Sequence, residues 1–106
     1  MRAGAYRTPV KLEQPVHTAA ADGSASLVYL FAGDDFAQIK PLRQSETLRS
    51  GRLEGIATHQ LRLRYRDDLA GGWRILSGQR TFRILSTAAA DDRSREIICL
   101  AEEEGT

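Results

Sequence analysis

Three pairs of adjacent aspartates are the first side chains in this sequence whose types and spacing could do chemistry. They are Asp34 with Asp35, Asp67 with Asp68, and Asp91 with Asp92. Paired carboxylates can bind a hard cation, but a calcium loop needs an Asp-x-Asp-x-Asp-Gly spacing that is missing here. Each pair lies where a hydrophobic run is broken, and aspartate is a common turn former. We therefore predict three turns and no metal site.

The candidate nucleophiles and bases show no catalytic motif. His17 lies in a polar segment, and His59 lies at the start of a strand-like run. Ser24 and Ser26 belong to a small, polar segment in which a turn role is expected. Cys99, the only cysteine, lies in an apolar run, where a free cysteine is usually buried and inert. A single cysteine also excludes an intrachain disulfide. We predict no enzyme activity and no cofactor.

The strongest polar pattern is an alternation of arginines with apolar residues. Arg62, Arg64 and Arg66 share one face of an expected strand, opposite Leu61, Leu63 and Tyr65. This basic face could contact DNA phosphates in a channel, contact an acidic surface of a neighbouring subunit, or be a solvated outer face. Between the two functional interpretations we favour the subunit contact, because three strong phosphate contacts would oppose the sliding of DNA.

Short strands must position these residues, because the chain consists of alternating runs broken by Gly, Asp and Pro. We expect strands at residues 9–14, 27–31, 36–40, 57–66, 73–76, 81–86 and 95–101. Pro15 is expected to end the first strand, and residues 33–35 are expected to form a turn. Residues 18–26, with Asp22-Gly23 at their centre, predict a long mobile loop. A short helix is expected between residues 42 and 55, capped by Ser45.

Length and composition fit one small globular domain spanning residues 1–106. Apolar residues make up 42% of the chain, which is enough for a folded core. The net charge is +1, so nothing demands a nucleic-acid partner. No long apolar run indicates a signal peptide or a membrane span, so we expect synthesis in the bacterial cytoplasm and no membrane partner. The predicted fold is mainly β: a small antiparallel β-barrel of about six to seven strands, with one short helix and a long mobile loop.

The order of several segments resembles a known family. The segments are Val10-Lys11-Leu12-Glu13, Ala37-Gln38-Ile39-Lys40-Pro41-Leu42, Thr58-His59-Gln60-Leu61-Arg62-Leu63-Arg64-Tyr65-Arg66, and Gly78 followed by Arg80-Thr81-Phe82-Arg83-Ile84-Leu85. In this order and spacing the chain resembles the phage head–tail joining proteins, also called head-closure or stopper proteins. These occur in tailed phages, prophages and gene transfer agents. The resemblance covers nearly the whole chain.

The resemblance implies a structural subunit of a connector ring that seals the DNA-filled head and provides the attachment platform for the tail. It implies no cofactor and no turnover. The expected partners are further copies of the chain, in a ring of six rather than twelve, and a portal-adaptor protein on the head side. A tail terminator or tail-tube protein is expected on the tail side, with packaged double-stranded DNA in non-specific proximity. The protein would be incorporated in the neck of a virion or phage-like particle.

Two sets of functional residues are predicted. The candidate subunit interface is Arg43, Glu46, Arg49, Arg62, Arg64, Arg66, Trp73, Glu102 and Glu103, the last two in an expected acidic tail. The candidate channel loop, which would retain DNA, is Thr18, Asp22, Gly23 and Ser24. Trp73 could equally be a core residue, because aromatic residues are enriched in both places.

Three alternative functions stay open. One is a small nucleic-acid-binding barrel of the OB or SH3-like kind, in which aromatic residues would stack on bases beside the arginine face. The expected position of Tyr65, opposite the arginines, counts against this alternative. Another is a tail terminator at the same junction, and a third is an accessory domain of an enzyme, with no activity of its own.

Overall fold

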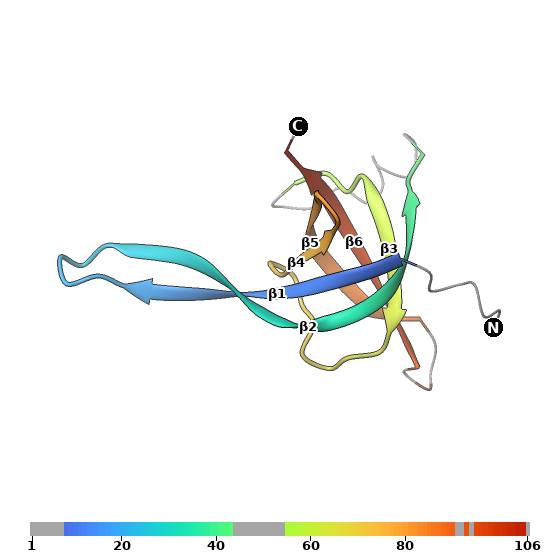
Figure 1. Cartoon of the computed structure of the whole chain (residues 1–106), viewed down its shortest axis with the longest axis horizontal. Helices are drawn as coiled ribbons and strands as arrows, with labels where there is room; N and C mark the ends of the chain where they lie inside the picture. The colour runs from blue at the N-terminus through green and yellow to red at the C-terminus, as the bar shows by residue number, and fades with distance from the viewer. Residues whose placement is uncertain (1–7, 44–54, 91–92, 94, 106) are drawn as a thin grey trace.

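Six strands account for most of the residues that the computed structural model describes, which are 8–43, 55–90, 93 and 95–105. The strands are β1 (Thr8–Ala19), β2 (Ala25–Pro41), β3 (His59–Arg64), β4 (Arg74–Ser77), β5 (Arg80–Ala89) and β6 (Glu96–Glu104). They form a closed barrel in the order β1-β2-β3-β6-β5-β4 (Figure 1). All neighbouring strands are antiparallel. The predicted small antiparallel β-barrel is thereby confirmed.

The short helix predicted between residues 42 and 55 falls almost wholly on residues 44–54, which lie outside the described part of the chain. Within the described ranges, no helix is long and apolar enough to cross a membrane.

The core fills the barrel with the side chains of alternate strand positions, as the pleat of a strand requires. Leu61 and Leu63 of β3 and Phe82 and Ile84 of β5 are fully buried, as their alternation predicts. The other buried members of the core are Val10, Leu12, Ala37, Leu69, Trp73, Ile75, Ile97, Cys99 and Ala101. No polar or charged residue among those described is buried. The charged groups therefore lie on the outer wall and at the rims, and any functional contact must be made there.

β2 continues through residues 33–35, where the sequence predicts a turn. Leu12 of β1 faces Gly33 while Glu13 faces Phe31, so one residue of β2 is left without a partner. The predicted turn was wrong because this extra residue forms a β-bulge, which bends a strand without ending it. Gly33 permits the bend with a φ of +142°, which residues with a side chain rarely adopt. Two predicted strands thus merge, and the described part of the chain has six strands.

The loop predicted at residues 18–26 is shorter in the structure: residues 20–24 form the turn of a long β-hairpin, and the flanking residues belong to its two strands. β1 and β2 pair without interruption from Glu13 opposite Phe31 to Ala19 opposite Ala25. Pro15 does not end β1, because beyond Glu13 this strand pairs with β2 alone among the described strands. A proline lacks one N–H donor and is tolerated at such a free edge.

The hairpin projects from the barrel as the long arm at the blue-to-cyan end of Figure 1. Six residues beyond Glu13 extend it by roughly 20 Å at ~3.3 Å per residue. The molecule measures 51 Å along its longest axis and 30 Å along each of the other two, which agrees with an arm of that length.

Candidate functional site

The part of the molecule that leaves the barrel has an apolar surface. We call residues 14–19 of β1 and 25–31 of β2 the hairpin stem. In this stem Leu27, Val28, Leu30 and Phe31 expose 46%, 40%, 49% and 60% of their surface. Neighbouring residues of a strand point to opposite faces, so Leu27 and Val28 make both faces of the stem apolar. A two-stranded ribbon of this kind is marginally stable alone.

The hairpin tip, residues 20–24, is a compact turn held by its own hydrogen bonds. The N–H of Ala20 donates to the carbonyl of Ser24 at 2.7 Å, and the N–H of Gly23 donates to the carbonyl of Ala20 at 3.0 Å. Ser24 donates from its hydroxyl and its N–H to Oδ1 of Asp22, at 2.7 and 2.9 Å. These bonds, the one from the hydroxyl first, hold the pKa of the Asp22 carboxyl below its ordinary value. The tip therefore carries a negative charge and no positive one.

Thr18, Asp22, Gly23 and Ser24, the candidate channel residues, are brought together by this geometry at the end of the hairpin. The hydroxyl of Thr18 lies 3.0 Å from that of Ser26 across the two strands. The tip has no lysine or arginine, so it lacks the positive charge on which strong binding of DNA phosphates depends.

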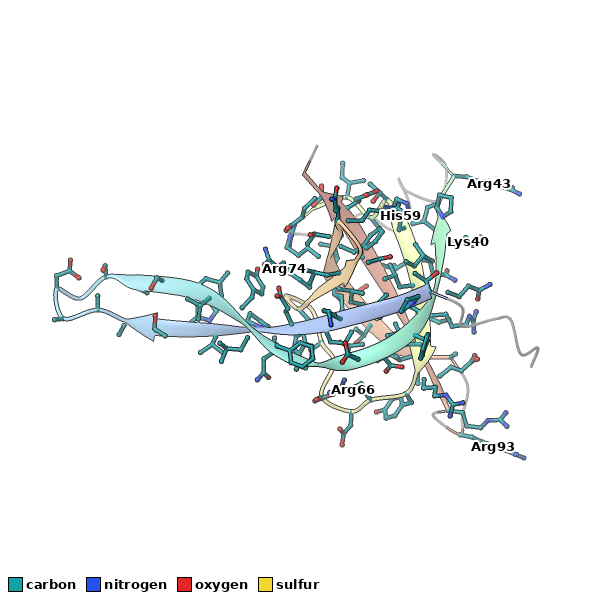
Figure 2. The ribbon with its side chains drawn as sticks, in the orientation of Figure 1. Lys40, Arg43, His59, Arg66, Arg74 and Arg93 are labelled. Atoms are coloured by element: carbon teal, nitrogen blue, oxygen red, sulfur yellow. The ribbon has the colours of Figure 1, made fainter. Side chains whose placement is uncertain are left out.

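Arg74 of β4 ties the root of the hairpin to the barrel. Its guanidinium carbon lies 3.8 Å from the centre of the Tyr29 ring, and its Nη2 donates to Oε1 of Glu13 at 3.0 Å. A second carboxylate, that of Glu104, lies 3.8 Å from Nη1. Figure 2 shows Arg74 beside the point where the hairpin leaves the barrel. One side chain thus contacts β1, β2 and β6, and it limits the directions that the hairpin can take.

Arg66 supports the bulge of β2 from the segment between β3 and β4 (Figure 2). Its Nη2 donates to the carbonyl of Ala32 at 3.5 Å, and a Cβ added at Gly33 would lie 3.3 Å from its Nη1. Asp68 accepts from Nε and Nη2 of Arg66 at 3.0 and 2.9 Å, and these bonds lower the pKa of the Asp68 carboxyl. The Arg66 guanidinium also lies 5.9 Å from the centre of the Trp73 ring.

The predicted basic face does not form a continuous ladder. β3 ends at Arg64, so Arg66 lies beyond it and turns toward Asp68. Arg62 donates to Glu96 of β6 at 2.8 Å. Arg64 is exposed. Because two of the three charges are paired within the chain, the face is less suited to phosphate contact than the sequence indicates.

The predicted acidic tail is wrong as a structural element, because β6 runs through residues 102–104 and pairs with β5. Glu103 accepts two hydrogen bonds from Arg80, at 2.9 and 3.1 Å, and Glu102 accepts one from Arg83 at 3.0 Å. These carboxylates are therefore bound by arginines of their own chain. The bidentate bond from Arg80 also lowers the pKa of the Glu103 carboxyl.

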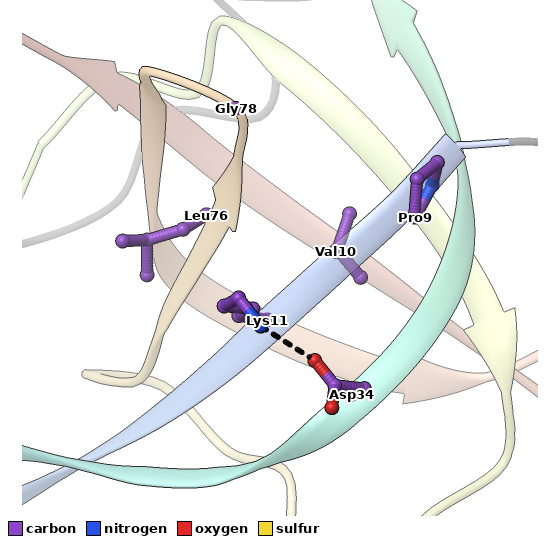
Figure 3. A pocket seen from close by; sticks show the side chains of 6 residues that line it. All are labelled: Pro9, Val10, Lys11, Asp34, Leu76 and Gly78. Atoms are coloured by element: carbon purple, nitrogen blue, oxygen red, sulfur yellow. Dashed lines mark hydrogen bonds and ion pairs between the residues drawn. The ribbon is translucent and has the colours of Figure 1, made fainter.

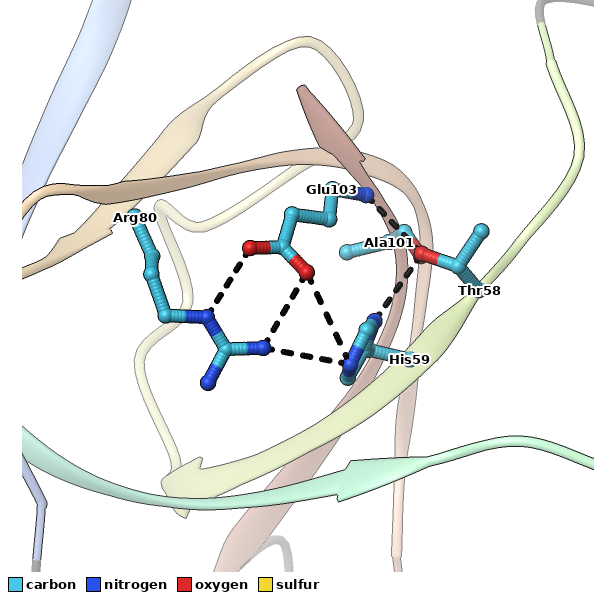
Figure 4. Close-up of polar contacts among 5 residues, drawn as sticks. All are labelled: Thr58, His59, Arg80, Ala101 and Glu103. Atoms are coloured by element: carbon cyan, nitrogen blue, oxygen red, sulfur yellow. Dashed lines mark hydrogen bonds and ion pairs between the residues drawn. The ribbon is translucent and has the colours of Figure 1, made fainter. Parts of the chain in front are cut away.

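A small polar network at this end of β6 surrounds His59 (Figure 4). Nε2 of His59 lies 3.3 Å from Nη2 of Arg80. An arginine can only donate, so this contact requires an unprotonated Nε2 and places the proton on Nδ1. Nδ1 then donates to the hydroxyl of Thr58 at 2.9 Å, and that hydroxyl accepts the N–H of Glu103 at 2.9 Å.

Burial lowers the pKa of His59 against the opposing effect of the Glu103 carboxylate, whose Oε1 is 3.9 Å from Nε2. Arg80 lowers it further. The ring of His59 also meets Phe82 edge-on, with centroids 5.1 Å apart. The polar groups of this network thus have hydrogen-bond partners within the chain, and the network connects β3, β5 and β6.

The remaining candidate interface residues are scattered. Trp73 is 7% exposed and belongs to the core, which is one of its two predicted positions and leaves little of it for a partner. Arg43 is exposed just after β2. Glu46 and Arg49 lie outside the described residues. The candidate set therefore does not form one patch on the described part of the barrel.

Residues 1–104 match the family model described as phage head completion protein. The chain belongs to this family. The resemblance to head–tail joining proteins drawn from the segment order is confirmed, and no curated protein sequence matches the chain.

Two solved structures share the fold of this head completion protein. One is a protein of Shigella flexneri 2a whose structure was determined in solution, with a TM-score of 0.75 and 20% identity over 99% of this chain and 98% of that one. The other is a chain of the virion of a native gene transfer agent particle, with a TM-score of 0.70 and 23% identity over 93% and 96% of the two chains.

Sequence reasoning missed the features that stand out most in this head completion protein. The apolar run at residues 27–31 was expected to form an ordinary strand, yet it lines an arm outside the barrel. Arg74, Arg80 and Arg83 were not singled out. Alternation with the core residues of β4 and β5 could have placed Arg74 and Arg83 on the outer wall, whereas Arg80 shares the face of Phe82 and lies at the exposed end of β5. Only the pairing of the strands shows which carboxylates these arginines bind.

Proposed function

We propose that this head completion protein is a structural, non-enzymatic subunit of the head–tail junction in a phage or phage-like particle. Copies of it form a ring that seals the DNA-filled head and provides the platform on which the tail attaches. The family match over residues 1–104 carries this proposal. The similar fold of a chain from the virion of a gene transfer agent supports it.

The architecture suits a ring subunit. A closed barrel with an apolar interior is rigid, and the wall around β6 is reinforced by ion pairs such as Arg62 with Glu96 and Arg80 with Glu103. A projecting arm with exposed apolar side chains gives each copy a means of contact beyond its own barrel. A ring needs such heterologous contacts, in which different patches of one molecule meet.

The partners follow from that position. The ring, of six copies rather than twelve, meets a portal-adaptor protein on its head side and a tail terminator or tail-tube protein on its tail side. Exposed Arg43 and Arg64 are candidate contacts for these partners or for the next copy. The chain is made in the bacterial cytoplasm and is incorporated in the neck of the particle.

The hairpin tip is our candidate for the element that reaches the channel and retains DNA. Its composition favours retention by steric closure, because Asp22 is its only charged side chain. Phosphates would be repelled by that carboxylate, so the tip would block DNA without binding it.

Electron microscopy of particles made without this chain tests the proposal. We expect free tails beside tailless heads that have lost their DNA, and re-expression of the chain should restore complete particles. Normal, fully tailed particles in its absence would refute the proposed function.

A further inference from the structure

The hairpin stem lacks the protection that exposed strands normally have. Between residues 14 and 31 the only Asp, Glu, Lys or Arg is Asp22, which lies at the tip. Natural proteins guard free strand edges with charges, prolines or bulges. The stem has Pro15 near its root and nothing comparable farther out. Such a surface is suited to burial against another protein and unsuited to contact with nucleic acid, which requires positive charge.

The stem is also held in place before any partner arrives. Arg74 stacks on Tyr29 and binds Glu13 at the root, and Arg66 supports the bulge at Ala32. Interactions that fix a contact surface in advance reduce the entropy lost on binding. The exposed side chains of Leu27, Val28 and Leu30 are therefore presented on a positioned arm.

A notch on the outer wall of the barrel has matching properties. It is lined by Pro9, Val10, Lys11, Asp34, Leu76 and Gly78, and its volume is about 300 Å³ (Figure 3). Its walls are mainly apolar, and two of its lining residues, Lys11 and Asp34, form an ion pair at 3.0 Å.

An exposed phenylalanine extends this notch. Phe36, which is 54% exposed, is the cross-strand partner of Pro9. Directly paired residues project from the same face of a sheet, so the Phe36 ring adds apolar area beside the notch.

We propose that the hairpin stem of one copy packs against this notch and Phe36 on a second copy of the same chain. The inference rests on the proposed ring and names the contact that joins its subunits. An arm of roughly 20 Å, from six residues at ~3.3 Å each, is long enough to reach across much of a second copy, which measures 30 Å along each of its two shorter axes. Stem and notch are different patches of one molecule, so each copy gives one arm and receives one, and the contacts can close a ring.

The first experiment places charges on the stem. Val28→Asp combined with Leu30→Asp puts two carboxylates on one face of β2. Sedimentation velocity of the full chain over a range of concentrations should show self-association weakened by at least about tenfold. The reason is that the two new carboxylates would be buried at the centre of the contact without a positively charged partner. Tyr65→Asp is the matched control, since Tyr65 is 40% exposed but belongs to neither stem nor notch, and it should associate like the wild type.

The second experiment mixes two variants that each keep one half of the contact. Leu76→Asp places a charge in the notch and leaves the stem unchanged. The stem variant, Val28→Asp with Leu30→Asp, has an unchanged notch. Each should be monomeric alone, and the mixture should give a discrete complex with one copy of each. Thermal melting of both variants shows whether the barrel is folded, so a failure to associate cannot be confused with unfolding.

Two results would overturn the inference. If the wild type self-associates and the stem variant does so equally well, another surface joins the copies, while the ring proposal stands. If the purified wild type stays monomeric but the stem variant is lost from particles, a different virion protein covers the stem. Failure of the ring proposal itself would be visible separately, as normal particles in the absence of the chain.

Discussion

The guanidinium of Arg74 lies over the ring of Tyr29, 3.8 Å from its centre, where the hairpin leaves the barrel. The same guanidinium donates to Glu13 on the neighbouring strand, from Nε at 3.2 Å and from Nη2 at 3.0 Å. A planar guanidinium can stack and donate in its plane at once, which an ammonium cannot. This one residue therefore couples the direction of the arm to the wall of the barrel.

Replacement of Arg74 by Ala should loosen the arm and leave the core intact. We expect a loss of about 1–2 kcal/mol in the free energy of unfolding, from a partly buried ion pair and a cation–π contact. Arg74→Lys should recover only part of it. Denaturant unfolding measures this loss, and Arg64→Ala, on exposed β3 surface, should stay within about 0.5 kcal/mol of the wild type.

Hydrogen exchange locates the effect of the same variant. Amides of the hairpin stem should exchange faster in Arg74→Ala, while those of β3 and β6 should keep their protection. Uniform loss of protection across the barrel would mean that Arg74 supports the whole fold instead of the arm.

His59 should make the stability of the barrel depend on pH. Folding lowers the pKa of His59, chiefly through burial, so the unfolded chain takes up a proton on this residue at a higher pH than the folded chain does. Stability from this group is therefore complete above its ordinary pKa of 6.5 and is lost progressively as the pH falls from that value through the lower pKa of the folded state.

Unfolding free energies of the wild type and His59→Gln between about pH 7.5 and 5.5 test this dependence, because the ordinary histidine pKa lies inside that window. The lower limit stays above the ordinary pKa of Glu103. Below that pKa, protonation of Glu103 would lower the free energy of unfolding as well and would mask the effect of His59. We expect the wild-type free energy to fall with pH more steeply than that of the variant. Equal slopes would contradict the assignment.

Cys99 should be inert in the folded protein. It is fully buried in β6, and burial raises the pKa of its thiol to about 12, so very little thiolate is present near neutral pH. A thiol reagent such as dithionitrobenzoate should leave the native chain unmodified and should react with one thiol per chain in denaturant. Rapid modification under native conditions would show that β6 opens.

Shortening of the hairpin tip tests its proposed role in retaining DNA. Replacement of residues 20–24 by Asn-Gly joins Ala19 to Ala25 through a two-residue turn that suits antiparallel strands. Assembly should persist, because the stem is unchanged, while nuclease treatment of tail-free heads should show loss of packaged DNA. Asp22→Asn keeps the length of the tip and should retain DNA, since closure by the tip is steric.

The alternation of apolar and polar residues predicted the mainly-β barrel correctly, together with a buried face at Leu61, Leu63, Phe82 and Ile84. That pattern is local, because successive side chains of any strand point to opposite faces. The segment order was also sufficient to indicate the family. Both properties are written in short stretches of chain, and neither requires knowledge of which strands meet.

Breaks in the pattern were harder to interpret. The same residues, a glycine and two aspartates at positions 33–35, are compatible with a turn and with a bulge. The pairing partner decides between them, and β1 runs on beside β2 here, so the chain bends without reversing. Likewise, a proline ends a strand that is paired on both sides but is tolerated in a strand with a free edge, as Pro15 is in β1.

The surfaces available for function were decided by tertiary structure alone. Strand register brings Arg80 to Glu103 and Arg62 to Glu96, which removes charges that the sequence offered to partners. It also leaves an apolar run at residues 27–31 outside the barrel, although in composition it resembles a core strand. The sequence by pattern alone identified the central parts of most strands and the buried face of β3 and β5, but not where β1, β2 and β6 end. Pairing between segments that are distant in the sequence determined the rest. It set the strand register, which decides which charges form ion pairs, and it set the point where β1 and β2 leave the barrel, which decides which apolar side chains stay exposed.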